Sequence, residues 1–127
     1  MSLQTPLRRV LGLGSAREGT GDWLGQRLSA VAIAPLGLWF AFSMLGLEHG
    51  QYELVRSWIA EPAHAILLIL LLVAVLYHSR LGLRVVIEDY LHGPALLIAL
   101  VLNQFLHLLA AVSGIFAIVV IAVGSGT

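Results

Sequence analysis

The fold of this chain is decided by residues 65–90, AILLILLLVAVLYHSRLGLRVVIEDY, where a purely apolar run becomes polar. Residues 65–77 carry no charge, and His78 follows them directly. A histidine at the edge of a membrane-spanning run is costly unless it has a partner, so His78 is a candidate functional residue. The uncharged run extends over residues 62–79, which gives about 27 Å of helix and predicts a membrane span.

The composition supports a membrane protein. Of the 127 residues, 59% are apolar and 11% are charged, whereas soluble domains have about 25% charged residues. Seven arginines balance seven carboxylates, so no basic field favours nucleic acid. The chain has no cysteine, which excludes disulfides and the thiolate ligation of zinc or iron-sulfur clusters. Any metal site must therefore depend mainly on histidine.

Two further apolar runs flank the central one. Residues 28–47 carry no charge and match the roughly 20 residues that cross a bilayer, with Pro35 predicting a kink. The chain is again uncharged from Pro94 to its end. We therefore predict an all-α integral membrane fold with three transmembrane helices, at about residues 28–47, 62–84 and 94–123, which pack with a second membrane subunit. The domains predicted are an N-terminal segment, residues 1–21, and a three-helix transmembrane anchor domain, residues 22–127.

The polar segments suggest how the helices begin and how they are oriented. Asp22 is a plausible N-cap for the first helix, and residues 48–61 form a polar connector. The connector holds one arginine, whereas the segment through Arg27 holds four and residues 80–84 hold two. The positive-inside rule then predicts a cytoplasmic N-terminus. On the third helix, small residues predict close packing with a partner membrane chain; they are Ala110, Ala111, Ser113, Gly114 and Ala117.

Helical spacing places three residues on the same face as His78. Gly82, Val85 and Asp89 lie within about 40° of it. Small residues one turn away on either side, Ala74 and Gly82, would leave a flat recess beside the imidazole, which suits a planar macrocycle. Histidine in an apolar groove is a usual axial ligand of b-type haem. The alternative is that His78 only forms hydrogen bonds within a helix bundle.

The residues His78, Gly82, Val86, Asp89 and Tyr90 form the pattern H-x-x-x-G-x-x-x-V-x-x-D-Y, and residues 19–30 read GTGDWLGQRLSA. With these motifs the chain resembles, over most of its length, the smaller of the two membrane-anchor subunits of bacterial succinate dehydrogenase, respiratory complex II. The resemblance implies a multi-pass protein of the bacterial inner membrane that is not catalytic alone. Its implied partners are the larger cytochrome b anchor subunit, the iron-sulfur subunit, the flavoprotein subunit and membrane lipid.

The resemblance also implies roles for individual residues. His78 would ligate the iron of haem b, with the second axial histidine coming from the larger anchor subunit, and Arg27 would lie near the haem propionates. Tyr90 would hydrogen-bond ubiquinone, the substrate, with Asp89 close by. A phenol can polarise a quinone carbonyl, and a carboxylate can relay protons. The alternatives are an interfacial tyrosine, a helix-end charge and, for Arg27, a headgroup anchor.

Two other histidines lie in predicted helices. His64 shares the face of His78 about 21 Å away, but it follows Glu61 and Pro62, so we expect an interfacial position. His107 could lie at a depth comparable with His78 and form an intrachain ligand pair with it. Alternatively, it belongs to a polar packing cluster that includes Asn103 and Gln104.

Two alternative functions follow from these interpretations. One is a b-type cytochrome subunit of another membrane oxidoreductase, and the other is a structural anchor without a cofactor. Tyr90 is rotated about 120° from His78 on an ideal helix, so the quinone role needs a turn after Asp89 or a contribution from a partner subunit.

Overall fold

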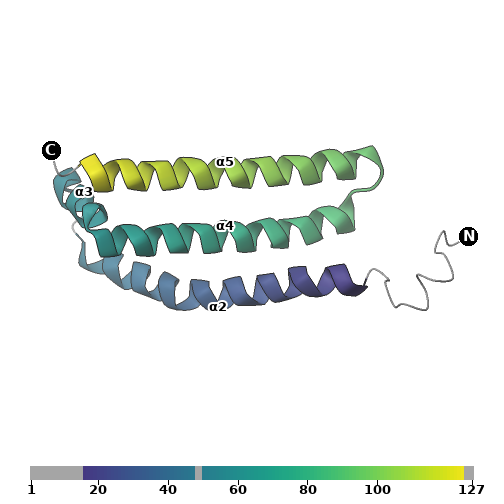
Figure 1. The fold of residues 1–127 in the computed structure, drawn as a ribbon, viewed down its shortest axis with the longest axis horizontal. Helices are drawn as coiled ribbons and strands as arrows, with labels where there is room; N and C mark the ends of the chain where they lie inside the picture. Colours follow the sequence, from purple (N-terminus) through teal and green to yellow (C-terminus); the bar gives the residue numbers. More distant parts are fainter. Residues whose placement is uncertain (1–15, 48–49, 125–127) are drawn as a thin grey trace, which may run out of the picture.

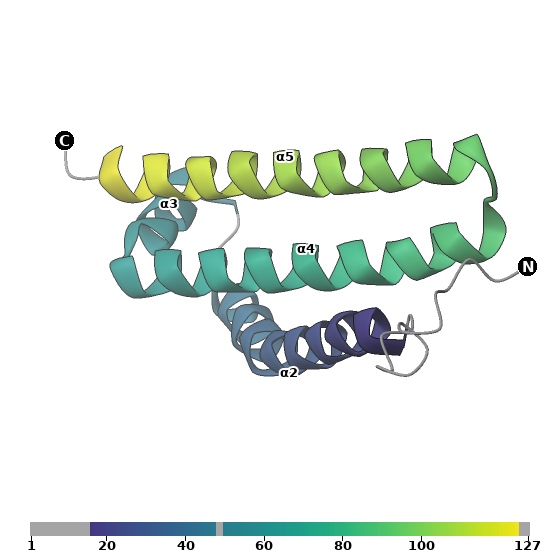
Figure 2. The same cartoon turned by 45° about the vertical axis from the view of Figure 1, so that its right-hand side comes forward.

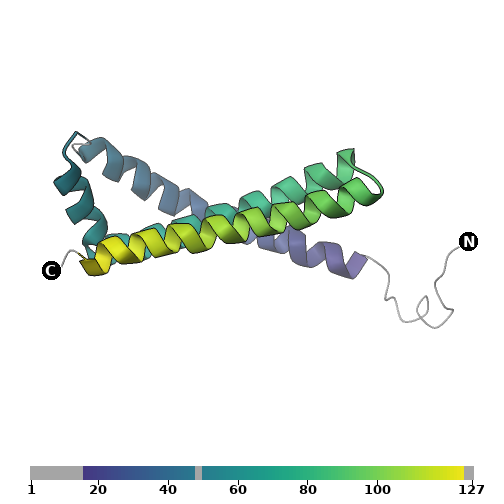
Figure 3. The ribbon, with the colours of Figure 1, turned by 90° about the horizontal axis from the view of Figure 1, so that it is seen from above.

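The computed structural model describes residues 16–47 and 50–124, with side chains described from residue 20 onward. This part of the chain contains four helices and no strand: α2 (Ala16–Gly46), α3 (Tyr52–Ala60), α4 (Pro62–Tyr90) and α5 (Pro94–Gly124). The long helices α2, α4 and α5 lie side by side with α4 in the middle, packed against both others (Figure 1). Seen from above, α2 crosses the antiparallel α4–α5 pair obliquely (Figure 3).

Each long helix can cross a membrane. Their apolar windows have mean hydropathies of 1.9, 2.2 and 2.6, and helices satisfy their own backbone hydrogen bonds, as hydrocarbon requires. The prediction of an all-α fold with three spans is confirmed. The expected spans fall within these helices, except that α2 ends one residue early, at Gly46.

The described part of the chain has almost no core of its own. Its buried apolar residues are Ala65 and Leu81, and its buried polar residues are Ser29 and Asn103. Large apolar side chains on every long helix are exposed, among them Phe42, Phe105 and Phe116. Exposed apolar surface of this extent belongs against lipid and other membrane helices.

The start of α2 differs from the sequence prediction. The helix begins at Ala16, so Asp22 lies inside it and the N-cap prediction is wrong. The carboxylate of Asp22 instead pairs with Arg84 of α4, at 2.7 Å. Residues 1–15 of the predicted N-terminal segment lie outside the described residues. Pro35 lies inside α2, and the helix continues beyond it to Gly46.

The predicted polar connector contains a helix, α3, that we did not predict. Trp58 of α3 stacks on Trp39 of α2 and on His64 of α4, with ring centroids 5.7 Å and 4.5 Å apart. Arg56 donates a hydrogen bond of 3.0 Å to the carbonyl of Gly124 in α5. The short helix therefore contacts all three long helices (Figure 2).

A short turn joins α4 to α5 at the opposite end. Leu91 caps α4 by donating to the carbonyl of Ile87, and Gly93 has a φ of +64°, a left-handed conformation that favours glycine. Along the pair, a Cβ on Gly114 would lie 2.5 Å from Leu72 Cδ2, so the missing side chain permits close packing. Of the predicted small face, Gly114 therefore contacts α4, whereas Ala110, Ser113 and Ala117 are exposed.

Candidate cofactor site

The imidazole of His78 points from α4 toward α2. Its Nδ1 lies 3.1 Å from Ser29 Oγ and 3.2 Å from the backbone carbonyl oxygen of Gln26. The Ser29 hydroxyl donates to that same carbonyl, at 2.9 Å. A carbonyl only accepts hydrogen bonds and the serine proton is already directed to it, so all three contacts are satisfied when Nδ1 carries the imidazole proton.

This tautomer leaves Nε2 as the nitrogen with a lone pair. Within residues 20–47 and 50–124, Nε2 has no hydrogen-bond partner. A neutral imidazole whose Nδ1–H is held by a backbone carbonyl is the usual form of a metal-ligating histidine. Ser29 is only 7% exposed, so water has little access to the contact that fixes the ring. The chemistry of His78 therefore fits an axial ligand.

The face of α4 on which the recess beside His78 was predicted packs against α2. A Cβ on Gly82 would lie 3.5 Å from Gln26 Nε2, so the Gln26 side chain borders the space over this glycine. Next to Gln26 on α2, a Cβ added at Gly25 would meet the Tyr77 hydroxyl at 2.5 Å. Glycines on both helices thus allow α2 and α4 to approach closely beside the histidine.

The described residues offer no second axial ligand beside His78. His107, the intrachain alternative, has Nδ1 2.8 Å from the carbonyl of Asn103 and Nε2 3.2 Å from Ser79 Oγ. Both nitrogens are thus within hydrogen-bond distance of protein groups, and the ring faces Ser79 while His78 faces α2. The arrangement favours the polar packing cluster, and a six-coordinate haem here would need a histidine from another chain.

His64 lies in the first turn of α4, at the α3 end of the molecule. Its Nδ1 is 2.9 Å from the Trp58 carbonyl and 3.3 Å from Glu61 Oε2, and its ring stacks on Trp58. His64 thus contacts Trp58 of the short helix α3 and Glu61, the residue between α3 and α4. These contacts do not join His64 to His78.

Arg27 follows Gln26, whose carbonyl contacts His78. The side chain of Arg27 is exposed, and its guanidinium carbon lies 5.3 Å from the centroid of the Trp23 ring. Arg27 therefore lies next to Gln26, whose carbonyl contacts the imidazole of His78. Its guanidinium is on a surface that another chain can reach. The contact with Trp23 gives the cation a neighbour without neutralising it.

Asp89 and Tyr90 end α4, and both are exposed; Tyr90 is 81% exposed. The helix continues through Tyr90, so no turn separates Asp89 from Tyr90. Leu91 caps the helix after Asp89 and Tyr90, so both residues keep helical geometry. Of the two routes considered, only a contribution from a partner subunit remains for bringing Tyr90 into a site.

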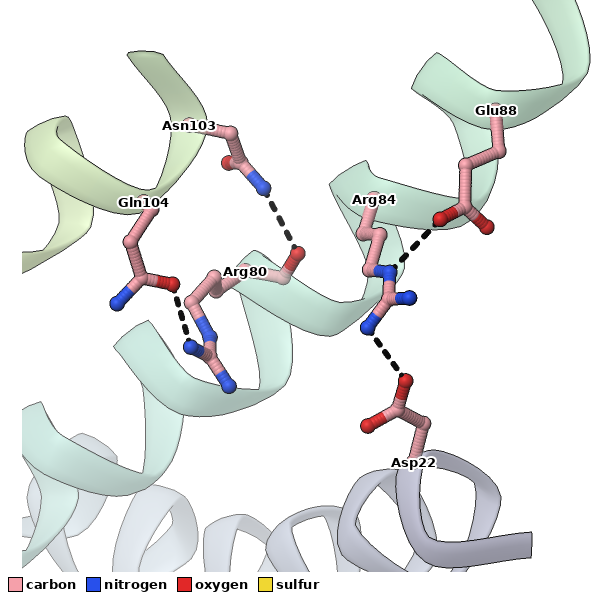
Figure 4. Close-up of polar contacts among 6 residues, drawn as sticks. All are labelled: Asp22, Arg80, Arg84, Glu88, Asn103 and Gln104. Carbon is pink, nitrogen blue, oxygen red and sulfur yellow. Dashed lines mark hydrogen bonds and ion pairs between the residues drawn. The ribbon is translucent and has the colours of Figure 1, made fainter. Parts of the chain in front are cut away.

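Toward this end of the molecule, Arg80 and Arg84 make a set of polar contacts that the sequence analysis did not predict (Figure 4). Asn103 Nδ2 donates to the carbonyl of Arg80 at 3.1 Å, and Arg80 Nη1 donates to Gln104 Oε1 at 2.6 Å. Arg84 bridges Asp22 Oδ2 and Glu88 Oε1, at 2.7 Å and 2.8 Å. The available signal was the four-residue spacing of the two arginines, which places them on one face of α4.

Comparison with known proteins agrees with this architecture. Residues 1–123 match the family described as succinate dehydrogenase/fumarate reductase transmembrane subunit. The succinate dehydrogenase hydrophobic membrane anchor subunit of Rickettsia bellii is 31% identical over 107 residues, which are 81% of this chain and 86% of that protein. The protein of the same name from Paracoccus denitrificans is 26% identical over 124 residues, covering 95% and 94%.

A shorter match, to the anchor subunit of Rickettsia conorii, has 34% identity over 79 residues, 61% of this chain and 63% of that protein. No solved structure matches the chain. The family match includes His78, α2, α4 and all but the last residue of α5. The resemblance found in the sequence is thus confirmed, and this multi-pass inner-membrane chain belongs to the transmembrane subunits of succinate dehydrogenase and fumarate reductase.

Proposed function

We propose that the chain is the hydrophobic membrane-anchor subunit of succinate dehydrogenase and that His78 supplies one axial ligand to haem b. The names of its relatives support the anchor role. The main support for the haem role is that the Gln26 carbonyl and the Ser29 hydroxyl form hydrogen bonds with Nδ1 of His78. The larger cytochrome b anchor subunit would provide the second ligand, because His107 has other partners.

When bound, haem b supplies a one-electron carrier within the membrane. This chain's own residues orient the ligand. The Gln26 carbonyl accepts a hydrogen bond from Nδ1–H, which fixes the ring plane, selects the tautomer and raises the basicity of Nε2. Burial of Ser29 protects this contact from water. Arg27, one residue from Gln26, would hold the propionates through its exposed guanidinium.

At the end of α4, Tyr90 and Asp89 would contribute to ubiquinone reduction. The Tyr90 phenol is a neutral donor for a quinone carbonyl, and the Asp89 carboxylate can pass on the protons that the reduced quinone takes up. Both side chains are exposed at the helix end, where a partner chain can complete the site. Since this chain has no cysteine, the iron-sulfur clusters would belong to the iron-sulfur subunit, which would dock nearby with the flavoprotein beyond it.

The haem assignment is tested in the assembled complex by replacing His78 with alanine. We expect the b-type absorption of the reduced complex to be lost or strongly perturbed. His64→Ala is the matched control, because His64 lies on the same helix but contacts Trp58 and Glu61 at the other end. Co-purification of the other subunits shows that both variants assemble. An unchanged spectrum in His78→Ala would overturn the assignment and leave a structural anchor.

A further inference from the structure

The side of α4 that faces α5 carries a groove made of two adjoining pockets. The first, about 190 Å³, has four polar residues in its lining, Arg80, Arg84, Asn103 and Gln104, and we call it the polar pocket. The second, about 240 Å³, is mainly apolar and is lined in part by Val73, Leu76, Leu108 and Ala111. Arg80 and Gln104 line both pockets. We call the two together the α4–α5 groove.

The groove becomes more apolar along the membrane direction. Its polar pocket lies nearer the turn between Tyr90 and Pro94, and its apolar pocket extends toward the middle of both helices. The uncharged part of α4, residues 62–79, spans about 27 Å and ends just before Arg80. Arg80 is therefore placed where hydrocarbon meets the headgroup layer.

The polar pocket carries positive charge that the described part of the chain does not balance. Arg84 has two carboxylate partners, Asp22 and Glu88. Arg80 instead donates to the neutral amide of Gln104 and stacks over Tyr77, 5.4 Å from the ring centroid. Among the described side chains, no carboxylate pairs with Arg80. Because Gln104 accepts through Oε1, its Nε2 remains a donor for a second acceptor.

We propose that the α4–α5 groove binds an anionic phospholipid. Its phosphate accepts hydrogen bonds from the guanidinium of Arg80 and the amide of Gln104, and an acyl chain lies along Val73, Leu108 and Ala111. The charge of Arg80 favours an anionic headgroup, and the apolar pocket below it favours a lipid over a free anion. Asn103, bonded to the Arg80 carbonyl, holds α5 against α4 beside the headgroup.

The test uses the intact complex in phosphatidylcholine nanodiscs with and without phosphatidylglycerol, followed by native mass spectrometry of the lipid that stays bound. We expect phosphatidylglycerol to be retained over phosphatidylcholine and Arg80→Gln to retain about fivefold less. Arg56→Gln is the control, since this arginine lies on α3 at the other end of the molecule. Ala111→Phe keeps Arg80 but fills the apolar pocket, so it should also lose the lipid.

Equal retention by the wild type and Arg80→Gln would overturn the proposal, as would no preference for phosphatidylglycerol in the wild type. If Arg80→Gln fails to assemble, Ala111→Phe decides, because lipid retained by this variant contradicts the proposal. Inorganic phosphate added as a competitor tests for a free-anion site. If Ala111→Phe takes up phosphatidylglycerol as the wild type does, and phosphate blocks this uptake equally in both, the groove binds an anion and the lipid proposal is overturned. The haem spectrum of the same samples tests the proposed function independently, since His78 does not line the groove.

Discussion

The hydroxyl oxygen of Ser29 on α2 lies 3.1 Å from Nδ1 of His78 on α4, joining residues 49 positions apart in the sequence. With the Gln26 carbonyl, which accepts from the same serine, this contact determines which imidazole nitrogen is protonated. Helix α4, which carries the histidine, thus does not by itself determine the tautomer of His78. The packing of α2 against α4 determines it, so mutations on α2 should change how well His78 binds haem.

Replacing Ser29 with alanine should weaken haem retention by about tenfold. One contact to Nδ1 is lost while the Gln26 carbonyl remains, so the effect should be smaller than that of removing His78. The measurement is haem bound per assembled complex, with the midpoint potential as a second readout. Ser57→Ala is a matched control, because Ser57 makes the same local bond, to the Leu54 carbonyl, on α3. Unchanged haem content and potential in Ser29→Ala would contradict the prediction.

Replacing His107 with leucine should leave the haem spectrum intact. His107 contacts Ser79 and its own helix at Asn103, so the loss should lower stability by about 1 kcal/mol. The spectrum and the melting temperature of the complex in detergent measure the two effects separately. Loss of b-type absorption in this variant would instead identify His107 as a ligand.

The three spans could be predicted from the sequence because uncharged runs of bilayer length have few alternative structures in hydrocarbon. The position of α3 could not be predicted, because this nine-residue helix depends on contacts with Trp39 and His64, which belong to other helices. The Asp22 cap failed for a similar reason: the carboxylate pairs with Arg84, 62 residues away. Local patterns locate elements, but they do not reveal such long-range partners.

For the candidate site too, the sequence predicted residues on one helix but not their contacts with another helix. Spacing on α4 singled out His78, but the contacts that fix its tautomer come from Gln26 and Ser29 on another helix. The recess expected beside Gly82 proved to be bordered by the Gln26 side chain, because α2 packs against this face. Helical spacing separates Tyr90 from His78, and because α4 continues to Tyr90, no turn after Asp89 brings the two closer.

Replacing Gly25 with alanine should loosen the contact between α2 and α4. The new Cβ would lie 2.5 Å from the Tyr77 hydroxyl and 3.2 Å from its ring, so the tyrosine must move. We expect the stability to fall by about 1 kcal/mol, the low end of the range for overpacked cores, because the clash is with the end of a side chain. Gly37→Ala is the control, since nothing lies within 4 Å of a Cβ there. Equal melting temperatures for the two variants would contradict this account.

The ion pair between Asp22 and Arg84 should stabilise the packing of α2 on α4 by about 0.5–1 kcal/mol. Both side chains are about half exposed, so the coupling should shrink as salt is added. A double-mutant cycle with Asp22→Ala and Arg84→Ala, read from the thermal stability of the complex, measures it. Glu88→Ala is the control, because it removes a partner on the same helix as Arg84. Additive single effects at low salt would show that the pair contributes nothing.

Replacing Tyr90 with phenylalanine should raise KM for ubiquinone or lower kcat, by about three- to tenfold in kcat/KM, the value of one neutral hydrogen bond. Tyr90 is 81% exposed in the isolated chain, so the folding of this subunit should change little. Tyr52→Phe is the matched control: this tyrosine is also exposed, at the start of α3 on the opposite end of the molecule. The haem spectrum should stay unchanged in both variants. Normal kcat and KM in Tyr90→Phe would show that its phenol does not contact the quinone, and the quinone donor would then have to come from a partner subunit.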